Sequence, residues 1–168
     1  MRSLTEKLEK KIKDKKAKIG IIGMGYVGIP LGLEFAGTGF SVTGFDKDST
    51  RVKEINSGKQ VMKHIPAKSM KEFVNNKGSS TNNFSEIRNM DCLIICVPTP
   101  LDEHEQPDMS YIESASKKIG ENLRKGQLVV LESTTYPGTT REIVKPILEK
   151  SELKAGKDFF LAYSPERE

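Results

Sequence analysis

The sequence predicts an α/β fold in which a doubly wound, parallel sheet of about six strands is covered by helices on both faces. Short apolar segments that suit buried strands alternate with longer amphipathic segments of helical period. The first apolar segment also runs directly into three closely spaced glycines, Gly23, Gly25 and Gly28. Such a glycine cluster suits a tight turn from a strand into a helix, so both observations support the same fold class.

Each element follows from its own local pattern. Apolar runs bounded by glycine, proline or polar residues give the strands, and apolar side chains at three- and four-residue spacing give the helices. In chain order, the expected strands are 17–23, 40–46, 78–84, 91–97, 127–132 and 158–163. The expected helices between them are 26–37, 48–56, 67–75, 110–123 and 139–150, the last with a kink at Pro146.

Residues 1–16 are expected to form a charged helical extension in front of a single domain, 17–168. Leu4, Leu8 and Ile12 recur at four-residue spacing among lysines and glutamates, which makes a narrow apolar stripe. The stripe has no Trp or Phe to anchor it in lipid. It therefore favours docking against the domain or a second subunit over binding to a membrane.

The net charge of +4 is concentrated at the N-terminus. Residues 1–18 carry eight Lys or Arg against three Asp or Glu, whereas the remainder carries 19 against 20. The folded surface thus lacks the basic excess that is typical of nucleic-acid binding. No apolar run approaches the about 18 residues of a membrane-spanning helix. With no secretory signal or disulfide framework in the sequence, we expect a cytoplasmic protein that binds neither nucleic acid nor a membrane.

The two cysteines, Cys92 and Cys96, lie in one apolar run. On a strand their side chains point to the same face. Because other metal-binding side chains are lacking nearby, we expect buried core thiols rather than a metal site.

Asp46 ends the second expected strand, 21 residues after Gly25. A carboxylate at about this distance accepts hydrogen bonds from the adenosine ribose of a dinucleotide, and it repels the 2′-phosphate of NADP. NAD is therefore the expected cofactor, although Lys47 and Arg51 soften the preference. The alternative is that Asp46 caps the following helix, with Asp48 as a second candidate for that role.

Polar loops follow the later strands, and in a parallel sheet all of them reach the same rim. Pro98 and Pro100 fix the backbone around Thr99, so its hydroxyl and amide are expected to face the crevice. Hydroxyl side chains cluster again after the fifth strand, at 133–135. These loops are the expected location of the functional site.

Four motifs occur in order: Gly-Met-Gly-Tyr-Val-Gly, Cys-Val-Pro-Thr-Pro-Leu, Leu-Glu-Ser-Thr-Thr-Tyr-Pro-Gly-Thr-Thr and Tyr-Ser-Pro-Glu-Arg. Together, they closely resemble the NAD-binding half of the UDP-glucose/GDP-mannose dehydrogenase family, which has a Rossmann-type fold. The second and third motifs look most like the branch that oxidises UDP-N-acetylglucosamine, with the UDP-N-acetylmannosamine branch next. The resemblance implies oxidation of C6 of a UDP-sugar to a carboxylate, in two hydride transfers that consume two NAD.

The resemblance also implies roles for individual residues. Thr134 and Glu166 would flank the reacting carbon, with Glu166 accepting a proton directly or through a water that Thr134 holds. Without the resemblance, Glu166 would be expected to cap or salt-bridge a surface turn. The residues that the resemblance places against NAD are Gly23, Gly25, Tyr26, Val27, Gly28, Asp46, Arg51, Val97, Pro98, Thr99 and Thr134.

The sequence departs from the family pattern in two places. Val61 and Lys63 stand where an aromatic residue and an acid are more usual. More important, the family's nucleophilic cysteine, in a Gly-Gly-x-Cys-x-Pro setting, and its catalytic lysine and asparagine lie in a later domain that this sequence does not contain. We therefore expect the chain to bind NAD without completing the oxidation, and a full-length form to bind the UDP-sugar as a homodimer. The alternative is a regulatory module that senses NAD(H) and catalyses nothing.

Overall fold

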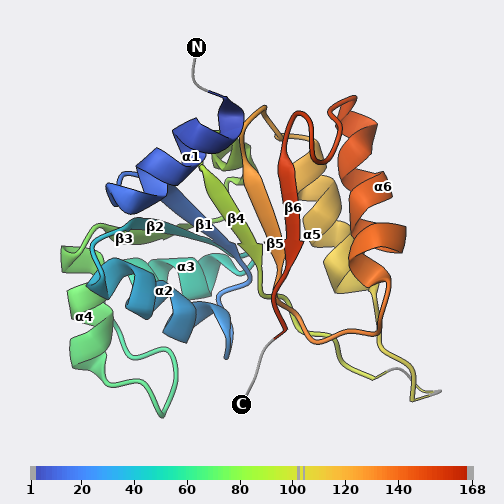
Figure 1. Ribbon diagram of the computed structural model, residues 1–168. Coiled ribbons are helices and arrows are strands. Elements are labelled where there is room, and N and C mark those ends of the chain that lie inside the picture. The colour runs from blue at the N-terminus through green and yellow to red at the C-terminus, as the bar shows by residue number, and fades with distance from the viewer. Residues whose placement is uncertain (1–2, 102, 104, 166–168) are drawn as a thin grey trace.

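Helices cover both faces of one six-stranded parallel sheet in the computed structural model of the protein (Figure 1). The structure describes residues 3–101, 103 and 105–165. The strand order is β3-β2-β1-β4-β5-β6, so successive strands are added first on one side of β1 and then on the other. The strands are β1 (Lys18–Ile22), β2 (Ser41–Phe45), β3 (Gly78–Thr81), β4 (Cys92–Ile95), β5 (Leu128–Leu131) and β6 (Phe160–Tyr163). The predicted doubly wound α/β fold is confirmed.

The helices connect the strands in the expected order. They are α1 (Leu4–Lys13), α2 (Gly28–Gly37), α3 (Ser49–Asn56), α4 (Ala67–Asn75), α5 (Ser110–Gly120) and α6 (Lys145–Leu148). Two short 3₁₀ helices, η1 (Phe84–Asn89) and η3 (Glu149–Ser151), and one π-helical turn, η2 (Thr140–Val144), complete the described elements. The sequence did not predict η1, because its six residues are too few to show a helical period.

The expected helix over 139–150 is divided into η2, α6 and η3. Pro146 stands in the first turn of α6, directly after the π-helical turn. Because proline has no N–H to donate to the preceding turn, the wider π geometry fits there and a regular helix does not. The expected helix over 139–150 is thus present as one unbroken helical segment, and its hydrogen-bond pattern changes just before Pro146.

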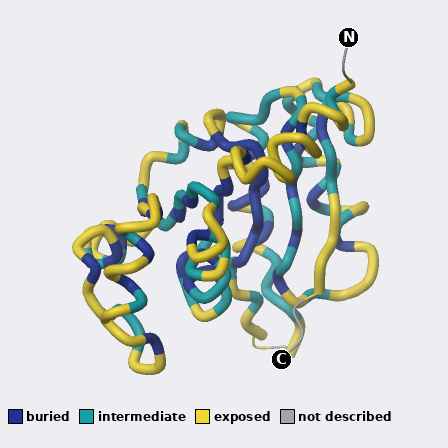
Figure 2. Tube along the Cα trace, turned by 60° about the vertical axis from the view of Figure 1, so that its left-hand side comes forward, coloured by how far each residue is buried: buried dark blue, intermediate teal, exposed yellow. Residues whose placement is uncertain are grey.

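Two apolar clusters fill the two sides of the sheet. Figure 2 shows that buried residues are frequent along the strands, whereas the outer loops are mostly exposed. In β4 the side chains alternate between them: Cys92 and Ile94 belong to the cluster under α2 and α4, whereas Leu93 and Ile95 belong to the cluster under α5 and α6. Cys96, just after β4, joins Cys92 on the same side. Both cysteines are buried thiols that form no disulfide, as expected from the sequence.

The register of the sheet brings the ends of four strands to one level. Ile22 at the end of β1 is paired with Phe45 of β2 on one side and with Ile95 of β4 on the other. Ile95 is in turn paired with Leu131 at the end of β5. The loops that follow these four strands therefore leave the sheet side by side.

Helix α1 lies across the opposite end of the sheet, where the strands begin (Figure 1). Leu8 of its apolar stripe is buried in the core cluster. Helix α1 begins with a capping box, in which the Ser3 hydroxyl accepts from the Glu6 N–H and the Glu6 carboxylate accepts from the Ser3 N–H. Leu8, the middle residue of the stripe, thus docks against the domain, which is one of the two surfaces that the sequence allowed, whereas Ile12 is 37% exposed.

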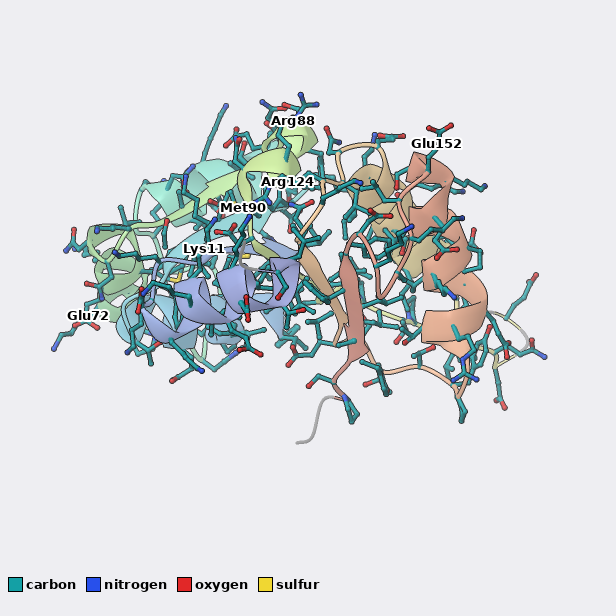
Figure 3. All side chains as sticks on the ribbon, turned by 45° about the horizontal axis from the view of Figure 1, so that its top comes forward. Lys11, Glu72, Arg88, Met90, Arg124 and Glu152 are labelled. Carbon is teal, nitrogen blue, oxygen red and sulfur yellow. The ribbon has the colours of Figure 1, made fainter. Side chains whose placement is uncertain are left out.

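A polar group, the basal cluster of Lys11, Asp91, Arg124 and Gln127, closes this end of the sheet. The Asp91 carboxylate is 4% exposed and accepts from Lys11 Nζ at 2.7 Å, from Arg124 Nη2 at 2.9 Å and from the Lys18 N–H at 3.0 Å. Lys11 and Arg124 reach this point from α1 and from the segment after α5 (Figure 3). Burial raises the pKa of Asp91, but these hydrogen bonds outweigh it and leave the pKa below its ordinary value.

Candidate functional site

A cleft of about 370 Å³ lies at the ends of β1, β2, β4 and β5, where the order of the strands changes direction around β1. Open α/β sheets bind ligands at this topological switch point. The residues that line the cleft are Gly23, Met24, Gly25, Tyr26, Val27, Asp46, Arg51, Cys96, Val97, Pro98, Thr99, Ser133 and Thr134.

The three glycines of the turn have three different physical roles. Gly23 has a φ of +96°, and a Cβ there would lie 2.9 Å from the carbonyl oxygen of Cys96. At Gly28 a Cβ would lie 1.9 Å from the carbonyl oxygen of Gly23, so this glycine lets α2 pack against the turn and does not line the cleft. A Cβ on Gly25 would meet nothing within 4 Å and would project into the open cleft. Gly25 thus leaves room that a ligand's phosphates can use.

The N-terminus of α2 opens onto this space. The helix begins at Gly28, two residues later than the sequence predicted, because 23–27 are used by the turn. No side chain caps its first N–H groups, and its first turn carries no acidic residue. The Ile29 N–H donates to the carbonyl oxygen of Gly25 and Pro30 has no N–H, so it is the positive end of the helix dipole that favours an anion here. Together with the open position at Gly25, this arrangement fits the diphosphate of a dinucleotide.

Asp46 lies at one end of the cleft and does not cap a helix. Its carboxylate accepts from the Met24 N–H at 3.1 Å and from the Asp48 N–H at 2.9 Å. Asp48 is the cap of α3, because its side chain accepts from the N–H groups of Thr50 and Arg51. The capping alternative thus applies to Asp48, and Asp46 keeps the position from which a ribose can be bound.

Arg51 approaches the glycine turn from α3. Its Nη1 donates to the carbonyl oxygen of Met24 at 3.1 Å, while Asp46 accepts from the N–H of that same methionine. Asp46 and Arg51 thus bind the N–H and the carbonyl oxygen of Met24 and hold the turn between β1 and α2 in place. Arg51 also places a positive charge on the wall of the cleft.

The opposite end of the cleft is formed by the loops after β4 and β5, and hydroxyl groups connect them. Ser133 Oγ donates to the carbonyl oxygen of Val97 at 2.7 Å, and Thr99 Oγ1 donates to the carbonyl oxygen of Thr134 at 2.7 Å. Ser133 is 5% exposed, whereas Thr134 is exposed at the surface of the cleft.

Tyr26 lines the cleft near the glycine turn. Its ring is 79% exposed and stacks on His64, with ring centroids 5.5 Å apart and planes inclined by 10°. His64 belongs to the loop between α3 and α4, which is held to the core by buried Ile65. The loop that departs from the family pattern at Val61 and Lys63 is thus in direct contact with the cleft.

The cleft gathers every residue that the resemblance placed against NAD except Gly28. Glu166, the expected proton acceptor, lies outside the described residues. The sequence reasoning did not assign Met24 and Cys96 to the cleft, and it placed the Ser133 hydroxyl at this rim without a contact to NAD. A sequence signal was available: Met24 lies between two turn glycines, Cys96 directly follows β4, and Ser133 comes two residues after the end of β5.

The Cys92 thiol lies at the start of β4, away from the cleft, and is not activated. Burial, and secondarily the charge of Asp91, raise its pKa to about 11, so the thiol stays neutral near pH 7. His, Cys, Asp and Glu side chains of the described residues do not gather into a group that could hold a metal ion. None of the helices in the described ranges combines the length and the hydropathy that spanning a membrane demands.

Comparison with known proteins was made by sequence and by structure. The chain is 43% identical over 154 residues to a UDP-N-acetyl-D-glucosamine 6-dehydrogenase from Pseudomonas aeruginosa. The matched region covers 91% of this chain and 36% of that protein. It is 36% identical over 152 residues to a UDP-N-acetyl-D-mannosamine dehydrogenase from Pyrococcus horikoshii, covering 89% of this chain and 36% of that protein. The chain thus spans about a third of the length of these relatives.

Among solved structures, the NDP-N-acetyl-D-galactosaminuronic acid dehydrogenase from Methanosarcina mazei superposes with a TM-score of 0.82 at 37% identity, covering 96% of this chain and 37% of that one. A ternary complex of GDP-mannose dehydrogenase from Pseudomonas aeruginosa gives the same TM-score of 0.82 at 32% identity, covering 89% of this chain and 36% of that one. The family model that matches residues 17–168 is described as "UDP-glucose/GDP-mannose dehydrogenase family, NAD binding domain". The chain therefore belongs to the UDP-glucose/GDP-mannose dehydrogenase family, and residues 17–168, which include the glycine turn and the cleft, match the NAD-binding domain of that family.

Proposed function

We propose that this chain holds NAD for the oxidation of C6 of a nucleotide sugar, with UDP-N-acetylglucosamine as the first candidate substrate. The observation that carries the proposal is the cleft, in which a glycine turn, Asp46 and two hydroxyl-bearing loops converge. Support for the sugar comes from the motifs after β4 and β5 and from the relative of 43% identity, whose name specifies UDP-N-acetyl-D-glucosamine.

The order of the strands supports one orientation of the cofactor in the cleft. Asp46 follows β2 and would bind the adenosine ribose, and the turn around Gly25 follows β1 and would bind the diphosphate. The nicotinamide half then extends over the loops after β4 and β5, towards Thr99 and Thr134. When bound, NAD supplies a hydride acceptor at its nicotinamide ring.

The remaining roles fall to the chain's own residues. Thr134 would hold a water or the substrate hydroxyl beside the nicotinamide, and Glu166 would accept the proton that leaves as the hydride is transferred. In a full-length form of the protein, Glu166→Gln should lower turnover roughly 10²–10⁴-fold while NAD binding is kept. A variant with normal turnover and a lowered melting temperature would instead assign Glu166 to bracing a turn.

The oxidation to a carboxylate also needs a thiolate nucleophile in this family. Neither Cys92 nor Cys96 has the Gly-Gly-x-Cys-x-Pro setting, and both are buried. The chain by itself would therefore bind NAD and leave the oxidation incomplete. Residues 17–168 would form the cofactor domain, residues 1–16 an appended helix, and a full-length form a cytoplasmic homodimer with a sugar-binding domain.

The test begins with calorimetry of the printed chain. We expect binding of NAD and NADH, weaker binding of NADP, and no NADH production from UDP-N-acetylglucosamine, UDP-N-acetylmannosamine or UDP-glucose. Absence of NAD binding at millimolar concentration would refute the proposal. If the reading frame continues, the same three sugars are assayed with the longer product: the sugar that is oxidised identifies the substrate, and a product that binds NAD but oxidises none of them is a sensing module.

A further inference from the structure

The two loops at the nicotinamide end of the cleft are joined by side chains at a point where the sheet's own hydrogen bonds stop. The last backbone bond between these strands runs from the Glu132 N–H to the carbonyl oxygen of Ile95 at 3.0 Å. Beyond it, Val97 and Thr99 are the loop residues that face β5, whereas Pro98 and Pro100 continue the side that faces β1, to which the Cys96 N–H donates at the carbonyl oxygen of Ile22. From there on, the two loops are connected by donors on side chains.

Hydroxyl groups supply these donors in both directions. Ser133, in the loop after β5, donates to the carbonyl oxygen of Val97 at 2.7 Å, with a second, longer contact of 3.3 Å to the carbonyl oxygen of Ile95. Thr99, in the loop after β4, donates back to the carbonyl oxygen of Thr134 at 2.7 Å. Both acceptors are backbone oxygens, so each contact fixes the path of the main chain and leaves the side chain of Thr134 free.

We propose that Thr99 and Ser133 are positioning residues that hold Thr134 at the nicotinamide end of the cleft. This inference rests on the proposed function, because it needs NAD to lie across the cleft from Asp46 to Thr134. The Thr99 hydroxyl then acts through the backbone of Thr134. Ser133, to which the sequence reasoning gave no specific role, holds the same loop through its bond to the carbonyl oxygen of Val97. Loss of either hydroxyl lets the loop after β5 move relative to β4.

The experiment compares two ligands that differ only at the nicotinamide. ADP-ribose keeps the adenosine, both phosphates and the second ribose, so it reports on Asp46 and the glycine turn. NAD adds the nicotinamide ring, so the ratio of the two dissociation constants reports on the loops after β4 and β5. Calorimetry of the unmodified chain, Thr99→Val, Thr99→Ser and Ser133→Ala gives this ratio, and melting temperatures show whether each variant is folded.

We expect Thr99→Val, which keeps the shape and removes the donor, to raise the dissociation constant for NAD about fivefold, the usual effect of one hydrogen bond. Its affinity for ADP-ribose should be unchanged. Thr99→Ser keeps the donor and should behave as the unmodified chain. Ser133→Ala should act in the same direction as Thr99→Val. Thr135→Val is the matched control, because its hydroxyl pairs with Thr139 and the residue does not line the cleft.

Three outcomes would overturn the inference. One is an equal loss of NAD and ADP-ribose affinity in Thr99→Val, which indicates a general disturbance of the cleft. Another is full NAD affinity in that variant. The third is an unmodified chain that binds ADP-ribose and NAD equally well. An unmodified chain that binds neither ligand refutes the proposed function itself, so the two failures are distinguishable.

Discussion

The two ends of the sheet are built in opposite ways. Where the strands begin, Lys11 and Arg124 of the basal cluster pair with Asp91, the Gln127 amide bonds to backbone groups, and α1 covers the cluster. Where they end, the cleft offers backbone N–H groups, hydroxyls and the open position at Gly25. Because parallel strands all point one way, stabilising contacts can be concentrated at one end while the other end stays free to bind.

Gly28 is an exception to this separation of stabilising and binding residues, because it lies at the binding end of the sheet but serves packing. In Gly28→Ala the new Cβ would lie 1.9 Å from the carbonyl oxygen of Gly23, and neither backbone segment can retreat easily. We expect a loss of unfolding free energy on the order of 3 kcal/mol, measured by urea denaturation.

Gly25→Ala is the matched control for this substitution. Its Cβ meets nothing within 4 Å, so stability should be kept while NAD affinity falls because the methyl group occupies the cleft. If Gly28→Ala were as stable as the unmodified chain, the assignment of Gly28 to packing would be wrong.

At the other end of the sheet, Asp91→Ala should lower stability without affecting NAD affinity. Removal of a buried ion-pair partner costs about 3–5 kcal/mol when the remaining charge is also buried. Here the side chains of Lys11 and Arg124 are 50% and 40% exposed, and they can turn towards water. We therefore expect about 2 kcal/mol. Glu113→Ala, which removes only the exposed pair with Lys117, should cost less than about 0.5 kcal/mol and serves as the control.

Asp46→Ser tests the binding end. Loss of the carboxylate should weaken NAD binding about tenfold, because a charge-assisted hydrogen bond to the ribose is worth roughly 1.5 kcal/mol or more. Binding of NADP should weaken less, since the repulsion of its 2′-phosphate also disappears. Asp48→Ser is the control, because serine still caps α3 and the preference for NAD should persist. Equal affinity of the unmodified chain for NAD and NADP would refute this role of Asp46.

We expect pH to have a smaller effect on stability, and this effect arises from Asp91 of the basal cluster. The pKa of Asp91 is lowered in the folded chain from an ordinary value of 3.8, so its contribution is complete above that value and is lost as the pH falls towards the folded pKa. Denaturation between pH 6 and pH 3 should show stability falling with pH. The fall should be shallower in Asp91→Ala, with the remainder due to groups such as Asp108 and Asp158, whose pKa values are also lowered by hydrogen bonds. An identical slope in both proteins would contradict this account.

Local patterns were enough to predict much of the binding end. Helix α4 has the predicted bounds, and the turn glycines, Asp46 and Thr99 all occupy the cleft or its wall. The reason is physical: a strand that ends in a glycine turn, or in a proline that cannot extend it, carries its functional residues at a fixed distance from its own end. Parallel strands then deliver those ends to one place.

The sequence by itself thus determined the fold class, the glycine turn and the side of the sheet on which function lies, because each depends on residues close together in the chain. Only the tertiary structure decided the contacts between distant segments. Lys11 meets Asp91 across 80 residues, Tyr26 stacks on His64, and Thr99 donates to Thr134 across 35 residues. No local period encodes such partners, because they depend on strand order and on register, which are set when all the apolar faces are buried together.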